Sequence, residues 1–289
     1  MTTYVLYNPI ANNKKGEESA RALETSLSGE TLEFVDVTKI TDYQAFFSDK
    51  KGDKIILCGG DGTLNRFVND TKGIELENIY LYGAGSGNDF LNDIGASGDV
   101  PVLIDKYLKN FPTVSVNGKE CLFVNGIGYG IDGYCCEVAD ELKKTSDKPI
   151  NYTSIAIKGL LGKFKTRCAK VTVDGVTTEY KDVWLAPAMN GRFYGGGMMI
   201  APGQDRLKNE TLSVVVLHKK SKLKTLIVFP SIFKGEHVTH TDMVAILTGK
   251  EIKVEFDKPT ALQIDGETVL GVTEYSARSY VASKEKETV

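Results

Sequence analysis

The first third of the chain alternates between short apolar runs and segments whose apolar positions recur at helical spacing. The apolar runs predict strands over 4–8, 32–37, 54–58 and 78–83. Apolar positions three or four residues apart predict helices over 14–27, 42–49 and 100–110, and one that begins near Leu64. Strands that alternate with helices are typical of a parallel sheet covered by helices. This part of the chain is therefore predicted to be α/β.

From about Phe111 the pattern changes to alternating strands joined by turn residues. Asn117-Gly118 and Asp174-Gly175 each separate two alternating segments, and such pairs are strong signals for a two-residue hairpin. More short strands follow, and two helices interrupt them at 134–144 and 221–235. This series of short strands favours a β-sandwich.

The two patterns divide the chain. We expect an α/β domain over residues 1–112 and a β-sandwich domain over 113–275. Ligands of an open parallel sheet bind beyond the carboxyl ends of its strands, and a cleft between domains is another common position. These are the places where we expect chemistry.

Composition and charge exclude some classes of function. The net charge is −3 and the pI is near 5.8, so the chain lacks the basic surplus that attracts nucleic acid. No apolar run approaches the roughly 20 residues of a membrane-spanning helix. Five cysteines without metal-ligand spacing, and a start that runs directly into a strand, predict a reducing, cytoplasmic setting. Any contact with a membrane would then be transient and peripheral.

Gly59-Gly60-Asp61-Gly62-Thr63 joins a predicted strand to a predicted helix. The N–H groups and dipole at a helix start attract anions, and glycines let the backbone approach a phosphate closely. Asp61 would repel a phosphate unless a cation lay between them, which indicates Mg²⁺ and a nucleoside triphosphate. The alternative is a tight structural turn in which Asp61 is a capping residue.

A second glycine loop follows the next strand. Gly83, Gly85 and Gly87 alternate with other residues, and Asn88-Asp89 then opens a helix. Two such loops after neighbouring parallel strands can hold one nucleotide from two sides. Asn8-Pro9, which closes the first strand, could hold a phosphate or the loop itself.

The sequence GYGIDG at 128–133 matches the dinucleotide-binding pattern but lacks the second strand with an acidic end. We interpret these glycines as packing positions between the domains.

Together these segments resemble the diacylglycerol kinase catalytic-domain family, specifically its bacterial soluble lipid kinases. The resemblance covers nearly the whole chain and rests on Asn8-Pro9, GGDGTLNRFVND, GSGNDF, YGGGMMIAP at 194–202 and QIDGE at 263–267. It implies a phosphofructokinase- and NAD-kinase-like α/β domain that binds ATP, a C-terminal β-sandwich, and a chain end, about 276–289, that returns to the first domain. It also suggests a homodimer.

The resemblance implies a set of site residues. Glu267 matches the family's general base and Asp265 lies beside it, although Asp-Gly alone would favour a hairpin turn. Asp61 is the third catalytic candidate, as the residue that holds Mg²⁺. The implied ATP contacts are Asn8, Thr38, Gly59, Gly60, Asp61, Gly62, Thr63, Asn65, Arg66, Ser86, Gly87 and Asn88.

One loop departs from the family. Its bacterial enzymes hold a structural metal where an Asp-Gly pair precedes a strand, and here Asn209-Glu210 stands there. The matching ligand positions are Arg206, Asn209 and Thr211, and the lost carboxylate weakens the case for that metal.

Three functions stay open. The first is an ATP-dependent kinase for diacylglycerol or a related lipid alcohol at a membrane surface. The second is a small-molecule kinase of the NAD kinase type, and the third is an inactive nucleotide- or lipid-binding homologue. Basic segments such as KGLLGKFKTRCAK, at 158–170, could face anionic lipid or solvent.

Overall fold

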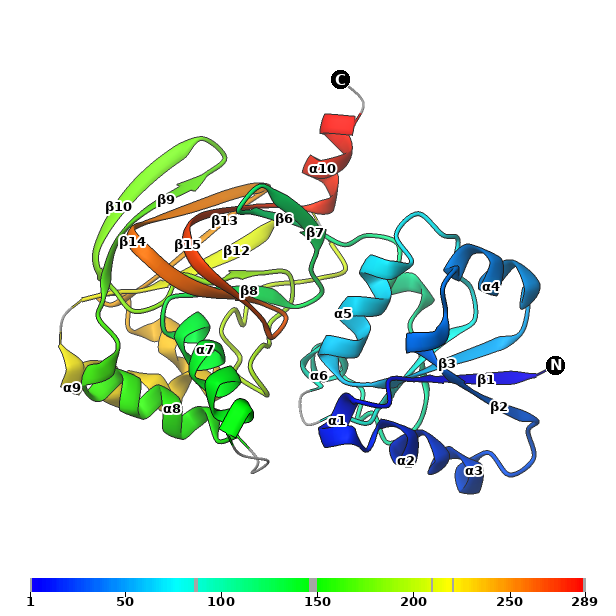
Figure 1. Ribbon diagram of the computed structural model, residues 1–289. Coiled ribbons are helices and arrows are strands. Elements are labelled where there is room, and N and C mark those ends of the chain that lie inside the picture. The colour runs from blue at the N-terminus through cyan, green and yellow to red at the C-terminus, as the bar shows by residue number, and fades with distance from the viewer. Residues whose placement is uncertain (1, 86–87, 146–149, 209, 220, 288–289) are drawn as a thin grey trace. The chain divides into compact units, whose positions relative to one another are not determined.

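The computed structural model describes residues 2–85, 88–145, 150–208, 210–219 and 221–287. Their contacts separate two compact units, Met1–Asn110 and Phe111–Val289 (Figure 1). Each unit has its own sheet. The fold therefore combines an α/β unit with a β-rich unit, as the hydrophobic pattern predicts. The domain limits themselves, and the return of the chain end to the first domain, stay predictions.

The first unit is a five-stranded sheet in the order β2-β1-β3-β4-β5. Four strands are parallel: β1 (Thr3–Tyr7), β2 (Leu32–Asp36), β3 (Lys54–Gly59) and β4 (Ile79–Gly83). The edge strand β5 (Val102–Leu103) is antiparallel to β4. The helices are α1 (Ala11–Lys14), α2 (Gly16–Arg21), α3 (Leu23–Ser26), α4 (Tyr43–Asp49), α5 (Asp61–Asp70) and α6 (Asp89–Asp93), with 3₁₀ turns η1 (Val37–Lys39) and η2 (Asp105–Tyr107).

The predicted helix over 100–110 is wrong. The segment forms β5 and then the single turn η2. The Asp105 carboxylate accepts hydrogen bonds from the backbone N–H groups of Asn78 and Ile79, both at 2.8 Å. These bonds fix the segment against the start of β4, where it completes the sheet edge instead of forming a helix.

Two other helix predictions also need correction. The helix expected over 14–27 is broken into short helices, and Lys14 at the first break has a positive φ of 67°. The helix expected from Leu64 begins at Asp61, directly after the glycine pair. The helix α4, in contrast, begins as predicted, because the Asp42 side chain caps it by accepting from Ala45 N at 2.9 Å.

The second unit is a network of ten paired strands. They are β6 (Thr113–Val116), β7 (Lys119–Leu122), β8 (Gly126–Tyr129), β9 (Arg167–Val173), β10 (Val176–Val183), β11 (Ala188–Met189), β12 (Leu212–Leu217), β13 (Val244–Gly249), β14 (Glu251–Ile264) and β15 (Glu267–Arg278). Asn117-Gly118 and Asp174-Gly175 form the predicted hairpin turns, with positive φ at all four residues.

The long strand β14 passes from one part of this network to the other. Its first half pairs with β9 over 252–256, and its second half pairs with β8 over 262–264. Pro259 lies between the two halves, where the register with β15 shifts. Proline lacks an N–H to donate and is tolerated at such irregularities. The strands thereby curve around one core instead of forming a flat sheet.

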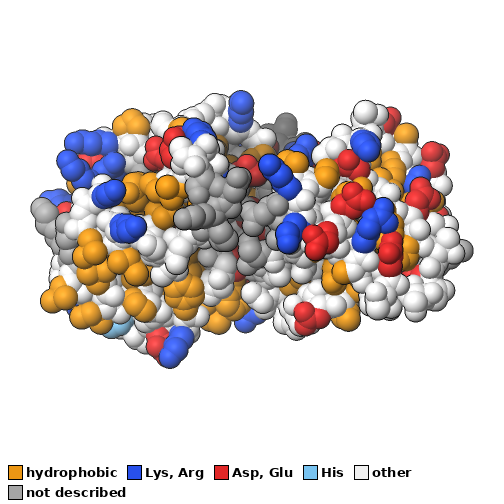
Figure 2. All heavy atoms as spheres, turned by 60° about the horizontal axis from the view of Figure 1, so that its bottom comes forward, with side chains coloured by type: hydrophobic (Ala, Val, Ile, Leu, Met, Phe, Trp, Pro, Cys, Tyr) orange, Lys and Arg blue, Asp and Glu red, His pale blue; other side chains and the backbone are white. Residues whose placement is uncertain are grey.

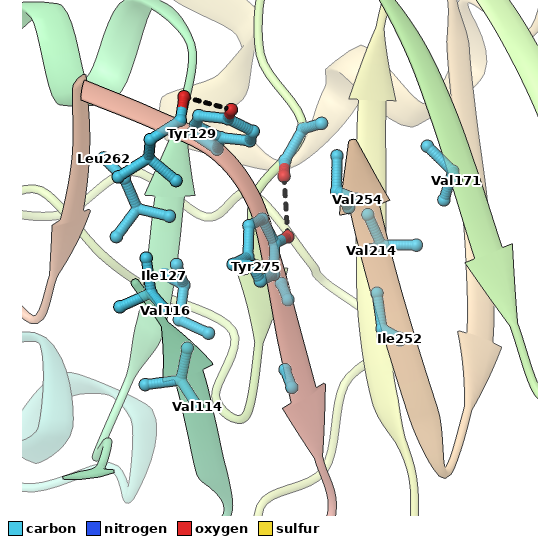
Figure 3. Close-up of a cluster of buried hydrophobic side chains, with 14 of the residues drawn as sticks. Val114, Val116, Ile127, Tyr129, Val171, Val214, Ile252, Val254, Leu262 and Tyr275 are labelled. Carbon is cyan, nitrogen blue, oxygen red and sulfur yellow. Dashed lines mark hydrogen bonds between the residues drawn. The ribbon is translucent and has the colours of Figure 1, made fainter. Parts of the chain in front are cut away.

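That core contains two tyrosines whose hydroxyl groups are satisfied by backbone (Figure 3). Tyr129 donates to Val272 O at 2.8 Å, and Tyr275 donates to Ala186 O at 2.9 Å. Aliphatic side chains such as Val114, Ile127 and Leu262 are fully buried around them. The two hydrogen bonds offset the cost of burying polar groups in an apolar interior.

Helices cover the strands of the second unit: α7 (Ile131–Thr145), α8 (Tyr152–Lys158), the π-helical turn η3 (Gly159–Lys163), α9 (Lys222–Val228), η4 (Phe229–Lys234), η5 (Glu236–Thr239) and α10 (Tyr280–Glu287). The glycines of GYGIDG explain how α7 packs so closely. A Cβ on Gly133 would lie 1.9 Å from Ala261 O, and one on Gly130 would lie 2.4 Å from Trp184 O. These contacts lie inside the second unit, so our interpretation of packing between domains is corrected.

A buried acidic group lies at the start of α7. Oδ2 of Asp132 and the hydroxyl of Tyr194 are buried and have no hydrogen-bond partner among the described residues. Burial raises the pKa of Asp132 to about 7, and the nearby Tyr194 hydroxyl offsets part of this rise. A raised pKa means that the folded state binds a proton that the unfolded state releases near pH 4.

We expect the free energy of unfolding to fall as pH rises from about 4 through about 7, because ionised Asp132 is disfavoured only in the folded state. Asp132→Asn should remove this dependence. The free energy of unfolding of the variant, relative to that of the parent chain, should therefore be higher at about pH 8 than at about pH 5, by roughly 1–4 kcal/mol. Denaturant unfolding at both pH values measures it. Glu141→Gln, an exposed change on the same helix, serves as control. Equal differences at both pH values would contradict the expectation.

Candidate functional site

Three strands of the first unit end at one edge of the sheet. Tyr7 is in register with Cys58, and Gly59 is in register with Gly83. Asn8, the loop after Gly59 and the loop after Gly83 therefore follow neighbouring parallel strands. Ala84 N donates to Gly59 O at 3.3 Å, which joins the two glycine loops directly.

The first glycine loop is the start of a well-anchored helix. Gly60 is the N-cap of α5 and its carbonyl accepts from Thr63 N and Leu64 N at 3.0 and 3.1 Å. A Cβ on Gly59 would lie 2.4 Å from the Thr63 hydroxyl oxygen, so glycine is needed for the Thr63 side chain to fold over the strand end. Leu64, Phe67 and Val68 are buried. This core contact fixes the helix start at the edge of the sheet.

Asp61 connects the two loops. Its Oδ2 accepts from Asp89 N at 2.8 Å and its Oδ1 from Phe90 N at 2.9 Å. These are the first residues of α6, so the carboxylate caps a helix. Asp61 is thus a capping residue, as the structural alternative expected, but the helix that it caps is α6 and not α5. A carboxylate oxygen can accept from more than one partner, so the chemistry of this side chain is also compatible with Mg²⁺.

The other predicted nucleotide contacts surround this edge. Oδ1 of Asn8 accepts from Ile10 N at 3.1 Å, and the exposed Thr38 hydroxyl donates to Asp36 at 2.7 Å. Nδ2 of Asn88 donates to Gly85 O at 3.4 Å, while its buried Oδ1 has no partner among the described residues.

On the outer part of α5, the Arg66 guanidinium lies 3.5 Å from Asp70, and the Asn65 carbonyl accepts from the Asn69 amide at 3.0 Å. Gly62 is exposed. Ser86 and Gly87 lie outside the described residues.

In the second unit, Asp265-Gly266 is the two-residue turn between β14 and β15. Ile264 pairs with Glu267, and both turn residues have positive φ, 45° and 96°. Gln263 Oε1 accepts from Gly266 N at 2.6 Å. The segment is therefore a hairpin turn in geometry, and it also presents an exposed Glu267 at the first position of β15.

Asp265 is held by backbone. Its carboxylate accepts from the N–H groups of Val124, Asn125 and Gly126, the last two at 2.8 and 3.0 Å. On the other side of Glu267, the Thr268 hydroxyl donates to Asp140 of α7 at 2.6 Å. Glu267 therefore stands between two anchored neighbours. Gln263 and Asp140, which provide part of this anchoring, were not among the predicted site residues.

The loop in which the family's bacterial enzymes hold a structural metal, and for which the sequence weakens that case, contains a buried arginine. The Arg206 guanidinium donates to Val124 O at 3.2 Å and to Asn125 Oδ1 at 2.8 Å. The Thr211 carbonyl already accepts from the Gln204 amide at 2.9 Å, and Asn209 lies outside the described residues. Within the described ranges, no group of three or more His, Cys, Asp or Glu side chains could hold a metal ion. The positive charge of Arg206 disfavours a divalent cation in this loop, and the metal positions stay a prediction.

Arg206→Met should lower the free energy of unfolding by about 1–3 kcal/mol, because Asn125 Oδ1 and Val124 O each lose a hydrogen bond from a charged donor, although Val124 O keeps the one from Asn190 Nδ2. A chelator should leave the unfolding midpoint of the parent chain unchanged when no nucleotide is present. Thermal unfolding measures both. Lys208→Met, at an exposed neighbouring position, is the matched control. A midpoint that falls with chelator and recovers with metal would show that this loop holds an ion after all.

Comparisons with known proteins place both units in known families. The diacylglycerol kinase catalytic domain matches residues 2–116, and the YegS C-terminal NAD kinase beta sandwich-like domain matches 125–279. A diacylglycerol kinase of Mycobacterium tuberculosis (strain ATCC 25618 / H37Rv) is 27% identical over 214 residues, 71% of this chain and 68% of that protein. YtlR of Bacillus subtilis (strain 168), provisionally named a lipid kinase, is 24% identical over 96% of both chains.

The solved structures agree at the level of fold. A provisionally named diacylglycerol kinase from Bacillus anthracis str. Sterne superposes with a TM-score of 0.64, over 96% of this chain and 93% of that chain, at 18% identity. The predicted fold class, an α/β unit with a C-terminal β-sandwich, is confirmed. The chain belongs to the diacylglycerol kinase catalytic-domain family, in the lipid-kinase form that carries a YegS C-terminal NAD kinase beta sandwich-like domain.

Proposed function

We propose that this lipid kinase transfers the γ-phosphoryl group of ATP to the hydroxyl of diacylglycerol or a related lipid alcohol. The observation that supports it best is that a chain of this family holds two candidate functional segments in fixed positions by hydrogen bonds and core contacts. One is a glycine loop that opens a fixed helix, and the other is an exposed glutamate held at a fixed hairpin. Phosphoryl transfer needs such positioned groups more than it needs covalent chemistry.

The glycine loops are the proposed ATP site. The start of α5 offers backbone N–H groups and a favourable dipole to phosphates, and Gly60 and Gly62 allow close approach. Thr63 supplies a hydroxyl, and Asn8, Thr38, Arg66 and Asn88 are the proposed surrounding contacts. Mg²⁺ bound with ATP would offset the phosphate charge, and Asp61 is the residue proposed to hold it, directly or through water.

Glu267 is the proposed general base, which would take the proton of the lipid hydroxyl as that oxygen attacks the phosphorus. The hydrogen bonds of Asp265 support this role because they fix the turn that carries Glu267. We therefore assign Asp265 a positioning role at the site.

The setting follows from the same proposal. None of the described helices is long and apolar enough to span a bilayer. A lipid substrate would then be met at the membrane surface, by transient peripheral association of a cytoplasmic chain. A homodimer is part of the proposal and is tested by light scattering of the purified chain.

Glu267→Gln should lower the rate of lipid phosphorylation by about 10²–10⁴-fold, the usual contribution of general base catalysis, and should leave ATP binding unchanged. The assay uses labelled ATP with Mg²⁺ and separate candidate lipids, with NAD as a soluble alternative acceptor. Glu274→Gln, an exposed change on the same strand, should retain full activity.

Three results would contradict this assignment. Label in NAD would indicate the small-molecule kinase instead. Equal activity of the Gln variant and the parent chain would remove Glu267 from the chemistry. ATP binding without transfer to any acceptor, in the parent chain, would favour the inactive homologue.

A further inference from the structure

Two helical segments of the second unit each bury one face in the same core. Ile155 and Leu160, from α8 and η3, lie in one buried cluster with Val228, Phe229 and Ile232, from α9 and η4. The segments also contact each other directly, since α9 packs on η3, and Figure 1 places α8 beside α9. They therefore form one continuous outer layer over this part of the second unit.

The outward faces of these segments are also apolar. Ile157 and Leu161 are four residues apart and 41% and 60% exposed, and Leu223 and Ile227 repeat the spacing at 72% and 66%. Phe233 is 41% exposed. A helix on a protein surface normally turns polar side chains to solvent. We call these five residues the apolar surface; an exposed cluster of this kind marks an interaction site.

The two sequence segments that carry the apolar surface contain an excess of basic residues, although one of these, Lys224, binds the carboxylate of Asp242. Residues 151–170 contain five Lys or Arg and no Asp or Glu, and residues 218–235 contain five Lys and again no acid. The whole chain, in contrast, has a net charge of −3. Figure 2 shows hydrophobic side chains gathered on the left part of the face it presents, with Lys and Arg side chains among them and at their border.

A cavity of about 280 Å³ adjoins the same segment. Lys163, Lys165 and Arg167 line it together with the apolar side chains of Phe164 and Leu270, and Glu137 is the one carboxylate in its lining. Cations therefore exceed anions here as well, beside Lys163 of η3.

We propose that the apolar surface, with its lysine border, is where the second unit docks onto an anionic lipid bilayer. Apolar side chains would enter the interface while lysines meet anionic headgroups, and both contacts favour binding. A second copy of the chain is disfavoured as the occupant, because two basic borders would face each other. The inference rests on the proposed function, since a bilayer is where a lipid alcohol would be found.

Vesicle sedimentation of the full chain tests the docking without any activity measurement. Vesicles contain phosphatidylcholine alone or phosphatidylcholine with phosphatidylglycerol. The parent chain should bind the anionic vesicles more tightly. Leu223→Gln with Ile227→Gln should weaken that binding by about tenfold or more, because two apolar side chains no longer leave water. Lys158→Glu should weaken it at low salt and less at high salt.

Val176→Gln is the matched control, because Val176 is 71% exposed and lies in the β9–β10 hairpin, outside the apolar surface. It should bind vesicles like the parent chain. Each variant is also assayed on diacylglycerol dispersed in detergent, where a docking variant should keep the parent rate.

Several outcomes would overturn the docking proposal. These are equal vesicle binding by the parent chain and the double variant, equal weakening by the Val176 control, no preference for anionic vesicles, or a loss of dimer in the double variant. Activity on detergent-dispersed lipid without vesicle binding would refute the docking alone. Vesicle binding that depends on the apolar surface, without lipid phosphorylation, would refute the proposed function and leave the docking standing.

Discussion

The three backbone hydrogen bonds accepted by Asp265 fix the part of the second unit on which the proposed chemistry depends. They join the β14–β15 turn to residues 124–126, far away in the sequence. Bonds between a carboxylate and backbone N–H groups are about twice as strong as neutral ones. An Asp-Gly turn by itself would leave the following side chain free to move with the hairpin. With Asp265 bound on one side and Thr268 on the other, Glu267 is presented at a defined position.

The first unit uses a carboxylate in the same way. Asp61 lies in one glycine loop and caps the helix that follows the other. An acid among phosphate-binding glycines is unexpected if only its charge is considered. Its hydrogen bonds supply a structural reason for it, and that reason is compatible with Mg²⁺ because carboxylate oxygens can accept more than one partner. In both units, then, an aspartate fixes the backbone beside the groups that are proposed to meet substrates.

The features that the sequence predicts well are local. The Asn-Gly and Asp-Gly turns, the helix over 42–49 and the glycine loop before α5 each depend on a few adjacent residues, and each is present in the structure. The helix expected over 100–110 fails because Asp105 binds the start of β4, 26 residues earlier. The partners of Asp61 and Arg206 are likewise 28 and 81 residues away. No periodic pattern contains such pairings, so the sequence could indicate which residues matter but not what they contact.

Arg206 and the apolar surface are two exceptions to the rule that charged side chains lie at the surface and apolar ones in the core. Burying an arginine is costly unless its N–H donors are paired, and here the guanidinium donates to Val124 O and Asn125 Oδ1. The backbone N–H groups of the same segment donate to Asp265. The cost of burying Arg206 is thus offset inside the fold, by hydrogen bonds to the segment that also anchors the β14–β15 turn. The exposed leucines and isoleucines of α8, η3 and α9 are a different case, because their helices are already anchored by the opposite faces and these side chains stay largely open to solvent. Apolar area that is exposed to water in this way points to a partner outside the folded chain, and the excess of lysines over acids around it is the reason for proposing an anionic surface as that partner.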